Sequence, residues 1–407
     1  MLIMDWAVLH LSTHQYFSVF KDESKLDINY IPSHLPHREL QINFLNQLFR
    51  FAVERPGKMA QRVLIVGSIG TGKTVLSQHF GLNKEKEARD KEINLRYVHI
   101  NCRECKGSLF IVLQRTILKF NPSFPRRGYS AEELLHLLMQ VLDEQNAYLI
   151  LTMDELDALI RNEGSDPIYN LTRVQENRLE APRRLSLICI LREQSYLEML
   201  DPSTRSTLQR NIIHLEKYSK SQLQDILHDR VDLAFKNRTV SEQILEFVAE
   251  LAALEEGDAR YAIELLWRAG KYADTLGASE VIPEHVRKAS ISIYPNIRKD
   301  MISSLGLHKK MLLLGITRRF KQSKSAYITM GEAEEAYALV CEEYEEKKRG
   351  HTQLWEYLKE LSALGIVQTE ISGSGQRGKT TLICLPKIPA SDLERELINT
   401  LYAKGNR

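Results

Sequence analysis

The chain has 407 residues, of which 43% are hydrophobic and 27% are charged, and its formal net charge is +2. This length predicts two or three domains, and the composition is that of a soluble globular protein. Five cysteines are a small and odd number, which does not suit a disulfide scaffold. The sequence contains no run of about 18 apolar residues that would predict a membrane span. The N-terminus lacks a basic start and a small-residue cleavage site, so we expect no signal peptide.

The first predicted elements surround the segment "GSIGTGKT". The run "RVLIV" (62–66) is rich in β-branched residues and predicts a buried strand, and "VLSQHF" after the segment predicts the opening of a helix. Strand, glycine-rich turn and helix form the context of a phosphate-binding loop, in which backbone N–H groups and the helix N-terminus attract phosphate oxygens. Lys73 would reach the β- and γ-phosphates of a bound nucleoside triphosphate, and the Thr74 hydroxyl would ligate Mg²⁺. The expected nucleotide-binding positions of the loop are Gly67, Gly70, Thr71, Gly72, Lys73 and Thr74.

The next segment, "YVHIN" (97–101), predicts a second buried strand. Cys102 and Cys105 follow in a C-x-x-C spacing, but no second ligand pair follows, and zinc requires four ligands. We expect these two cysteines to belong to the core.

A capped helix is predicted after Ser130, because Ser130 and Glu133 form a capping box. Its expected apolar face contains Leu134, Leu137, Leu138, Val141 and Leu142.

A third strand, Ala147–Met153, ends in Asp154 and Glu155. Carboxylates at the end of a buried parallel strand fit a Walker-B arrangement, in which Asp154 holds Mg²⁺ and Glu155 orients or deprotonates the attacking water. Leu185–Leu191 predicts a fourth strand. The alternation of strands and helices therefore indicates an α/β domain around a parallel sheet.

Charge is segregated in the C-terminal part of the chain. Residues 296–329 hold eight basic residues against one acid, whereas residues 330–346 hold seven glutamates and no base. The basic residues of this block are Arg298, Lys299, Lys309, Lys310, Arg318, Arg319, Lys321 and Lys324. A basic block in this position favours a nucleic-acid partner.

The segment "GSGQRGKT" (373–380) also matches the phosphate-loop pattern, but its flanks alternate apolar and polar residues. They predict strand, turn and strand, without the helix that a phosphate loop requires. Three predicted helices precede this hairpin, and the third has Leu354, Leu358, Leu361 and Leu364 on one face. Three helices and a hairpin make a winged helix. Thr352 and Gln353 on the third helix, with Arg377 and Lys379 on the wing, would contact DNA, although winged helices also serve as protein-contact modules.

These segments together resemble archaeal replication initiators of the origin-recognition/cell-division-control type, which are AAA+ ATPases. The resemblance covers about Phe20 to Leu385. Its motifs are "YIPSHLPHRE", "HINCR", "LTMDELDALIR", "LDPSTRSTL", "YSKSQLQDILHDR", "GDARYAIELL" and "HTQLWEYLKELSALGIV".

The resemblance implies further roles for residues outside the phosphate loop. Tyr30, Pro32, His37 and Arg38 would line the adenine pocket, Tyr218 and Arg230 would close over the nucleotide, and Arg260 would be the sensor-2 arginine and act in catalysis. Arg192 replaces the asparagine that is usual at sensor 1, which puts hydrolysis by the isolated chain in doubt. Arg205 is either an arginine offered to a neighbouring subunit or an ordinary helix residue. Arg126 and Arg127 lie in an inserted loop that either touches DNA or is merely solvated.

The resulting prediction is an AAA+ core (16–216), a helical lid (217–294), a winged-helix domain (295–390) and a C-terminal helix (391–407). The implied protein binds ATP or ADP with Mg²⁺, is at most a slow ATPase used as a switch, and binds double-stranded origin DNA. Its other implied partners are the replicative helicase and paralogous initiators, and no membrane partner is expected. The expected location is the cytoplasm, in association with the nucleoid. Two alternatives stay open: a helicase-loader or transposition-type ATPase, and a signalling ATPase whose winged helix contacts protein.

Overall fold

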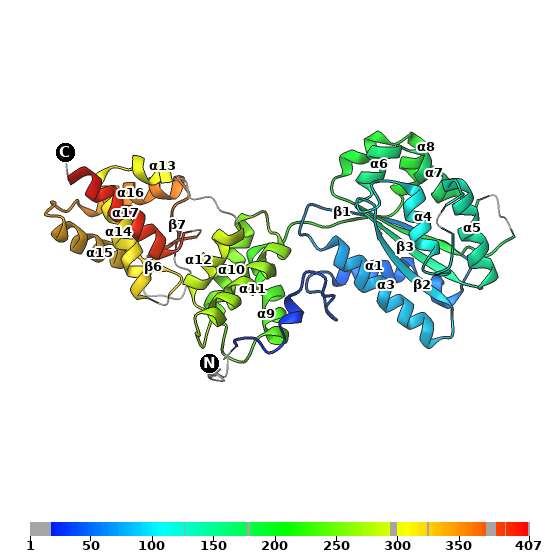
Figure 1. Ribbon diagram of the computed structural model, residues 1–407, viewed down its shortest axis with the longest axis horizontal. Helices are drawn as coiled ribbons and strands as arrows, with labels where there is room; N and C mark the ends of the chain where they lie inside the picture. The colour runs from blue at the N-terminus through cyan, green and yellow to red at the C-terminus, as the bar shows by residue number, and fades with distance from the viewer. Residues whose placement is uncertain are drawn as a thin grey trace, which may run out of the picture. The chain divides into compact units, whose positions relative to one another are not determined.

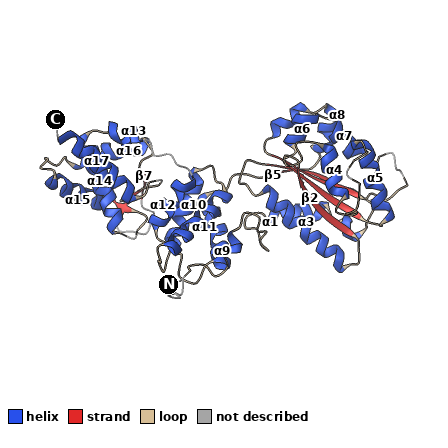
Figure 2. Ribbon diagram, in the orientation of Figure 1, coloured by secondary structure: helices blue, strands red, loops and turns tan. Residues whose placement is uncertain are grey.

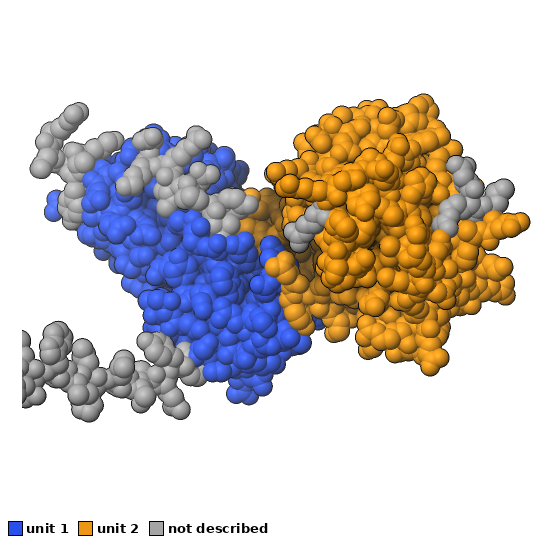
Figure 3. Space-filling model, turned by 45° about the vertical axis from the view of Figure 1, so that its right-hand side comes forward, with its two compact units in different colours: residues 1–28, 227–251, 262–407 blue, residues 29–226, 252–261 orange. Residues whose placement is uncertain are grey.

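The computed structural model describes residues 18–125, 127–176, 180–293, 299–323, 325–371, 380–386 and 388–405. It consists of two compact units, coloured separately in Figure 3. The core unit contains Asn29–Ile226 and Ala252–Tyr261. The lid–winged-helix unit contains Met1–Ile28, Leu227–Leu251 and Ala262–Arg407.

A five-stranded parallel sheet forms the centre of the core unit, with the strand order β2-β3-β4-β1-β5. Its strands are β1 (Arg62–Val66), β2 (Leu95–Asn101), β3 (Tyr148–Asp154), β4 (Leu185–Leu191) and β5 (Ile212–His214). The predicted strands at 62–66 and 185–191 have the observed bounds. Their aliphatic runs suit burial on both faces, which is characteristic of parallel sheets covered by helices.

Helices cover both faces of this sheet, as Figures 1 and 2 show. Successive side chains of a strand point to opposite faces. The helix layer on one face contains α1 (Glu39–Leu48), α2 (Phe51–Glu54) and α3 (Lys73–Asp90). The layer on the other face contains α4 (Leu109–Ile117), α5 (Ala131–Glu144), α6 (Asp157–Glu163), α7 (Asp166–Arg173), the 3-10 turn Gln194–Met199 and α8 (Pro202–Leu208). In β1, Val63 and Ile65 pack in the cluster with α1–α3, whereas Leu64 and Val66 pack in the cluster with α4–α8.

Helix α5 begins with the predicted capping box of Ser130 and Glu133. Its buried face was predicted only in part. Leu134, Leu138 and Leu142 are buried as expected, but the other buried positions are Leu135 and Met139. Leu137 and Val141, which were predicted to be buried, are only half-buried. Leu135 and Met139 lie on one side of the row formed by residues 134, 138 and 142, and Leu137 and Val141 lie on the other side. Either side would complete an apolar stripe, and packing against α4 buries the side with Leu135 and Met139.

Four further helices follow the core strands: α9 (Lys220–Ala234), α10 (Glu242–Leu254), α11 (Ala259–Thr275) and α12 (Pro283–Ile293). The described N-terminal segment, which includes the 3-10 turn Glu23–Leu26, packs on these helices. The Val19 N–H donates to Asp274 Oδ1 over 2.7 Å, and the ring of Phe20 lies 4.7 Å from that of Phe235.

The remaining elements form the winged helix. They are α13 (Lys299–Ser304), α14 (Leu307–Gln322), β6 (Ile328–Thr329), α15 (Met330–Glu343), α16 (His351–Ala363), β7 (Gln368–Ile371), β8 (Thr381–Cys384) and α17 (Ala390–Gly405). Strands β7 and β8 pair antiparallel, and β6 joins them in the order β6-β8-β7. The second match to the phosphate-loop pattern is therefore flanked by two strands. Residues 372–379 lie outside the described residues.

Two details of the winged helix differ from the prediction. Strand β6 was not predicted, because two residues carry too little periodicity. Leu364 is exposed and not part of the apolar face of α16, because the helix ends at Ala363 before the left-handed Gly365. Leu354, Leu358 and Leu361 are buried as expected.

Within the lid–winged-helix unit, a buried arginine joins α12 to the winged helix. Arg287 is 1% exposed, and its guanidinium donates from Nε to the carbonyl of Leu385 over 3.0 Å. It lies 4.5 Å from the centre of the Phe320 ring and 5.4 Å from that of Phe247. Among the described helices of both units, none has the length and hydropathy of a bilayer-spanning segment.

Candidate nucleotide site and nucleic-acid interface

The phosphate loop connects the end of β1 to the N-terminus of α3. Gly70 and Gly72 have φ angles of +76° and +85°, which are left-handed and strained for other residues. The Lys73 Nζ donates to the carbonyl oxygens of Gly67 and Ser68, over 2.6 Å in each case. Burial lowers the pKa of Lys73, and nearby Arg192 and Arg260 lower it further, while Asp154 opposes the shift. The loop therefore presents a cation and a helix N-terminus to the same space, which suits phosphate.

The predicted metal residues lie together at the carboxyl ends of β1 and β3. The Thr74 hydroxyl donates to Asp154 Oδ2 over 2.6 Å, and the Glu155 N–H donates to Asp154 Oδ1 over 2.8 Å. His99 Nε2 lies 3.2 Å from the same Oδ2. Burial on its own raises the pKa of Asp154, but the hydrogen bonds from His99, Thr74 and Glu155 outweigh it and leave the pKa below its usual value. The site thus holds an ionised carboxylate beside a hydroxyl, a donor pair that Mg²⁺ accepts when phosphates and water complete its shell.

Glu155 and Arg192 form an ion pair at the ends of β3 and β4. Arg192 is the residue that takes the place of the usual sensor-1 asparagine in the predicted site. In the structure its guanidinium donates to Glu155 Oε1, and this hydrogen bond raises the pKa of Arg192. The backbone of Glu155 is left-handed, with φ of +49°.

Arg38 and Tyr218, both predicted for the nucleotide site, are stacked. The Arg38 guanidinium lies 4.0 Å from the centre of the Tyr218 ring and donates to the carbonyl of Thr71 over 2.9 Å. Burial raises the pKa of Tyr218, and the positive charge of Arg38 opposes the shift. His37 Nε2 lies 2.8 Å from Asp225 Oδ2. These contacts connect the predicted adenine side to the phosphate loop within one unit.

Two other predicted adenine-side residues, Tyr30 and Pro32, are half-buried. The carbonyl of Pro32 lies 3.0 Å from His79 Nδ1 of α3, so it is attached to the helix that begins at the phosphate loop.

The predicted sensor-2 arginine follows a turn that packs on the phosphate loop. The Ala259 N–H donates to the carbonyl of Gly70 over 3.3 Å, and Arg260 is exposed in the core unit. Arg230, by contrast, belongs to the lid–winged-helix unit, where it is buried and donates to the carbonyl of Lys25 over 2.9 Å. The predicted role of Arg230 at the nucleotide stays a prediction.

The N-terminal end of α16 carries the predicted DNA contacts that the structure describes. Thr352 and Gln353 are exposed, and exposed Lys347, Lys348 and Arg349 precede them. Arg377 and Lys379 on the wing lie outside the described residues, as does Arg126 in the inserted loop. Arg127 is exposed in that loop.

Of the five basic side chains of the 296–329 block that the structure describes, four pair with acids of the winged helix itself. These four pairs give the block a structural role, and its use as support for DNA binding stays a prediction. Arg318 pairs with Glu343 and Glu394, and Lys321 pairs with Glu394. The other described pairs are Lys309 with Glu360 and Arg319 with Glu332, and Lys310 is buried on the carbonyl of Ser303. Arg298, Lys324 and the side chain of Lys299 lie outside the described part.

The contact of His99 with Asp154 was not predicted from the sequence. His99 belongs to β2, where it pairs in register with Thr152 of β3. The sequence signal that could have indicated it is a histidine inside the otherwise apolar strand segment "YVHIN". The predicted core role of Cys102 and Cys105 agrees with their full burial. In the described ranges, no group of three or more His, Cys, Asp or Glu side chains is placed to hold a metal.

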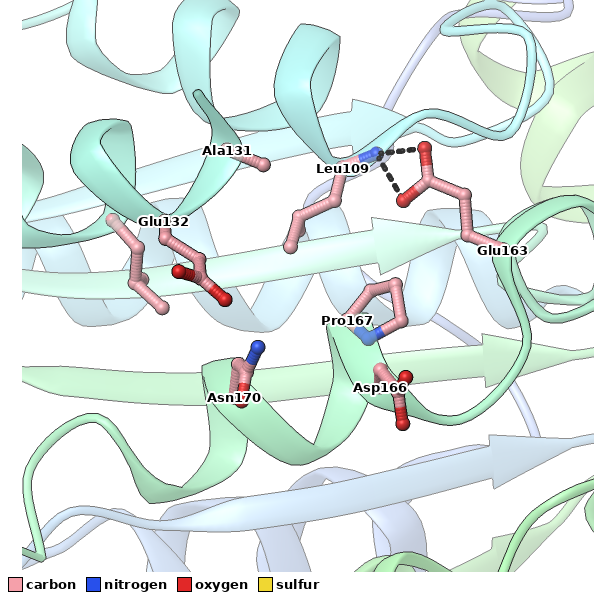
Figure 4. Close-up of a pocket in the computed structure, with 8 residues that line it drawn as sticks. Leu109, Ala131, Glu132, Glu163, Asp166, Pro167 and Asn170 are labelled. Atoms are coloured by element: carbon pink, nitrogen blue, oxygen red, sulfur yellow. Dashed lines mark hydrogen bonds between the residues drawn. The ribbon is translucent and has the colours of Figure 1, made fainter. Parts of the chain in front are cut away.

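A pocket of about 260 Å³ lies elsewhere in the core unit, between α4, α5, α6 and α7 (Figure 4). Glu163 accepts a hydrogen bond from the Leu109 N–H at the start of α4. None of the lining residues is a predicted nucleotide, metal or DNA residue.

Comparison with known proteins identifies the family. The chain is 36% identical over 394 residues to "ORC1-type DNA replication protein 2" of Sulfolobus acidocaldarius, which covers 95% of this chain and 94% of that protein. The chain belongs to the ORC1-type DNA replication proteins. Residues 224–291 match the Cdc6 AAA+ ATPase-type lid domain, and residues 300–395 match the CDC6 C-terminal winged helix domain.

Solved structures of this family confirm the predicted fold class. The crystal structure of Cdc6p from Pyrobaculum aerophilum superposes with a TM-score of 0.82 at 33% identity, over 95% of this chain and all of that chain. The Aeropyrum pernix ORC1 protein, solved in complex with DNA, superposes with a TM-score of 0.62 at 26% identity, over 95% of this chain and 99% of that chain. The chain therefore has the α/β core, the lid and the winged helix of these proteins.

Proposed function

We propose that the chain is a replication initiator that binds origin duplex DNA, uses bound ATP or ADP with Mg²⁺ as a conformational switch, and helps to recruit the replicative helicase. The observation that carries this proposal is the convergence of Lys73, Thr74, Asp154 and Glu155 at one edge of the sheet. Family membership supports the replication role. The predicted domain division is kept, since the lid match lies inside 217–294 and the winged-helix match overlaps 295–390.

The nucleotide would be held from two sides. Lys73 and the loop glycines would bind the β- and γ-phosphates, and Arg260 would reach the γ-phosphate from the turn beside Gly70. Thr74 and Asp154 would hold Mg²⁺, which neutralises phosphate charge when bound. The stack of Arg38 on Tyr218 supports an adenine pocket on that side of the loop.

The test of nucleotide binding compares wild type with Lys73→Ala and Lys86→Ala. Lys86 is an exposed lysine on the same helix, so its substitution removes an equal charge away from the loop. Each purified protein is denatured, and released ATP and ADP are measured by chromatography. We expect nucleotide with wild type and Lys86→Ala, and at least about a tenfold loss with Lys73→Ala because the phosphate cation is gone. Equal occupancy in all three proteins would contradict the assignment of Lys73.

The DNA interface would use the N-terminal end of α16 and the wing. Lys347, Lys348 and Arg349 are exposed directly before Thr352 and Gln353, so phosphate-binding cations would adjoin base-reading side chains. The DNA complex of the Aeropyrum relative, whose chain superposes along its length, supports this role.

The test of the DNA interface measures affinity for duplex DNA against salt. Lys348→Ala/Arg349→Ala should weaken binding and reduce the magnitude of the log–log salt slope by about 2, since each lost phosphate contact removes about 0.9. Arg377→Ala tests the wing in the same way. The matched control is Lys86→Ala/Arg89→Ala, which removes two exposed cations from α3. An unchanged slope in both winged-helix variants would remove the proposed interface.

The same experiments separate the two alternatives. A motor-type helicase loader would show ATP turnover stimulated by DNA and nucleotide-dependent oligomers. A signalling ATPase would show nucleotide binding without salt-dependent affinity for DNA.

A further inference from the structure

The ends of β3 and β4 place a carboxylate and a guanidinium against each other. Met153 of β3 is in register with Cys189 of β4, and the Leu156 N–H donates to the carbonyl of Ile190 over 3.0 Å. The residues that follow these strands are therefore fixed as neighbours. Glu155 turns into the left-handed region, and its Oε1 accepts a hydrogen bond from Arg192 Nη2. Both side chains are mostly buried: that of Glu155 is 23% exposed and that of Arg192 is 31% exposed.

We propose that Arg192 is a positioning residue that engages the Glu155 carboxylate and thereby slows hydrolysis of bound ATP. The proposal rests on the proposed nucleotide site. It assigns to Arg192 a role different from that of a sensor of the γ-phosphate alone, because its guanidinium already has an anionic partner in the protein.

The chemistry of hydrolysis explains the effect. The oxygen of a water molecule attacks the γ-phosphorus, and the bond from that phosphorus to the oxygen bridging to the β-phosphate breaks. The water gives up a proton to the Glu155 carboxylate, and ADP and inorganic phosphate leave. A general base needs an available oxygen aimed at the water. While Arg192 occupies Oε1, the carboxylate is held toward β4 and that oxygen is engaged.

The γ-phosphate is the natural competitor for Arg192. Val66 of β1 is in register with Leu191 of β4, and the Gly67 N–H donates to the carbonyl of Leu191 over 3.4 Å, so Arg192 follows β4 directly beside the start of the phosphate loop. A phosphate draws the guanidinium as a second anion, since arginine binds both carboxylate and phosphate through the same fork of N–H groups. ATP would thus loosen the ion pair, and ADP, which lacks the γ-phosphate, would let it re-form. Hydrolysis is then slow because each turnover requires the pair to open.

The experiment measures steady-state ATP hydrolysis and nucleotide affinity for wild type, Arg192→Asn, Arg192→Gln and Arg192→Lys. Removing the guanidinium frees Glu155, so kcat should rise by about tenfold in Arg192→Asn and Arg192→Gln, with KM changed less than about twofold. Lysine keeps the charge but loses the fork, so Arg192→Lys should stay near the wild-type rate. The two uncharged variants guard against a local folding defect in either one.

The double variant Arg192→Asn/Glu155→Gln connects the effect to Glu155. It should be as slow as Glu155→Gln alone, which a general change in packing would not produce. A kcat that is equal to or lower than wild type in both uncharged variants, with nucleotide still bound, overturns the proposal and makes Arg192 a stabiliser of the phosphate charge. Loss of nucleotide binding in wild type would instead remove the proposed nucleotide site itself.

Discussion

Among the residues that the structure describes, buried charged side chains have specific polar or aromatic contacts. Arg38 is buried on the Tyr218 ring and on the carbonyl of Thr71, and Asp154 is surrounded by three donors. Such contacts offset the cost of removing a charge from water. His285 of α12 illustrates the other solution. It is 3% exposed, and burial, together with the charge of Lys288, lowers its pKa from 6.5 to about 4. The neutral imidazole is therefore the form that fits the lid.

His285 should make stability depend on pH. Because its folded pKa lies below its unfolded pKa, its contribution is fully present above pH 6.5 and is lost as the pH falls toward 4. Between pH 7.5 and 5 this residue should remove about 2 kcal/mol from the free energy of unfolding. Chemical denaturation at both pH values checks this, with His285→Gln as the comparison, since glutamine does not titrate. A pH dependence equal in both proteins would show that His285 is not the cause.

At the scale of elements, the winged helix is held together by charge as well as by its apolar core. Arg318 and Lys321 of α14 are bound by Glu343 of α15 and Glu394 of α17. The positive residues that precede α16 have a different environment, because Lys347, Lys348 and Arg349 are exposed. We therefore expect structural and DNA-binding cations to be separate sets in this domain.

Arg318→Ala should affect stability and not DNA binding. The side chain is partly exposed, so its pairs should contribute only about 1 kcal/mol to the free energy of unfolding. Thermal unfolding should show a melting temperature lowered by a few degrees. Affinity for duplex DNA and its salt slope should stay at wild-type values, unlike those of Lys348→Ala/Arg349→Ala. A loss of affinity comparable to that double variant would return Arg318 to the DNA interface.

An element could be predicted from the sequence where its own residues determine it, and not where contacts with distant elements determine it. Strands β1 and β4 have the predicted bounds, because burial on both faces leaves an unbroken aliphatic run. The predicted buried face of α5 was wrong in part, because two stripes of that helix are equally apolar. Packing buries Met139 and leaves Val141 half-buried. The ion pairs of the basic block could not be predicted, because the sequence does not show that Glu343 of α15 and Glu394 of α17 contact α14. The Glu155–Arg192 pair likewise depends on which strands are neighbours.

At the scale of the whole molecule, most of the lid (Leu227–Leu251 and the helices from Ala262) and the winged helix belong to one compact unit. Polar contacts cross between these two parts: Arg287 donates to Leu385 and Ala326, Tyr327 donates to Glu250, and the Ala390 N–H donates to Glu284. Buried polar groups that satisfy one another specify a single arrangement of the surfaces that carry them. Helix α16 and the lid should therefore behave as parts of one cooperative body.

Arg287→Met tests this cooperation. Methionine retains packing between Phe247 and Phe320 but leaves the carbonyls of Leu385 and Ala326 without their donor. We expect a loss of about 3 kcal/mol in the free energy of unfolding of this unit, since buried acceptors lose their partner. Hydrogen exchange should accelerate together in α12 and β8. Arg395→Met, at an exposed position of α17 whose arginine pairs with Asp392 of the same helix, is the matched control and should leave exchange in both segments unchanged. Acceleration of α12 alone would show that the two parts open independently.

The bridge from α17 to α14 also matters to anyone who shortens this protein. Glu394 is the shared acceptor for Arg318 and Lys321, so a fragment trimmed before α17 would deprive both cations of this acid and leave Arg318 with Glu343 alone. Such a fragment would adhere to heparin, RNA or any other polyanion through a charge patch created by the cut. Its apparent affinity for DNA would exceed that of the full chain and would be mistaken for recognition.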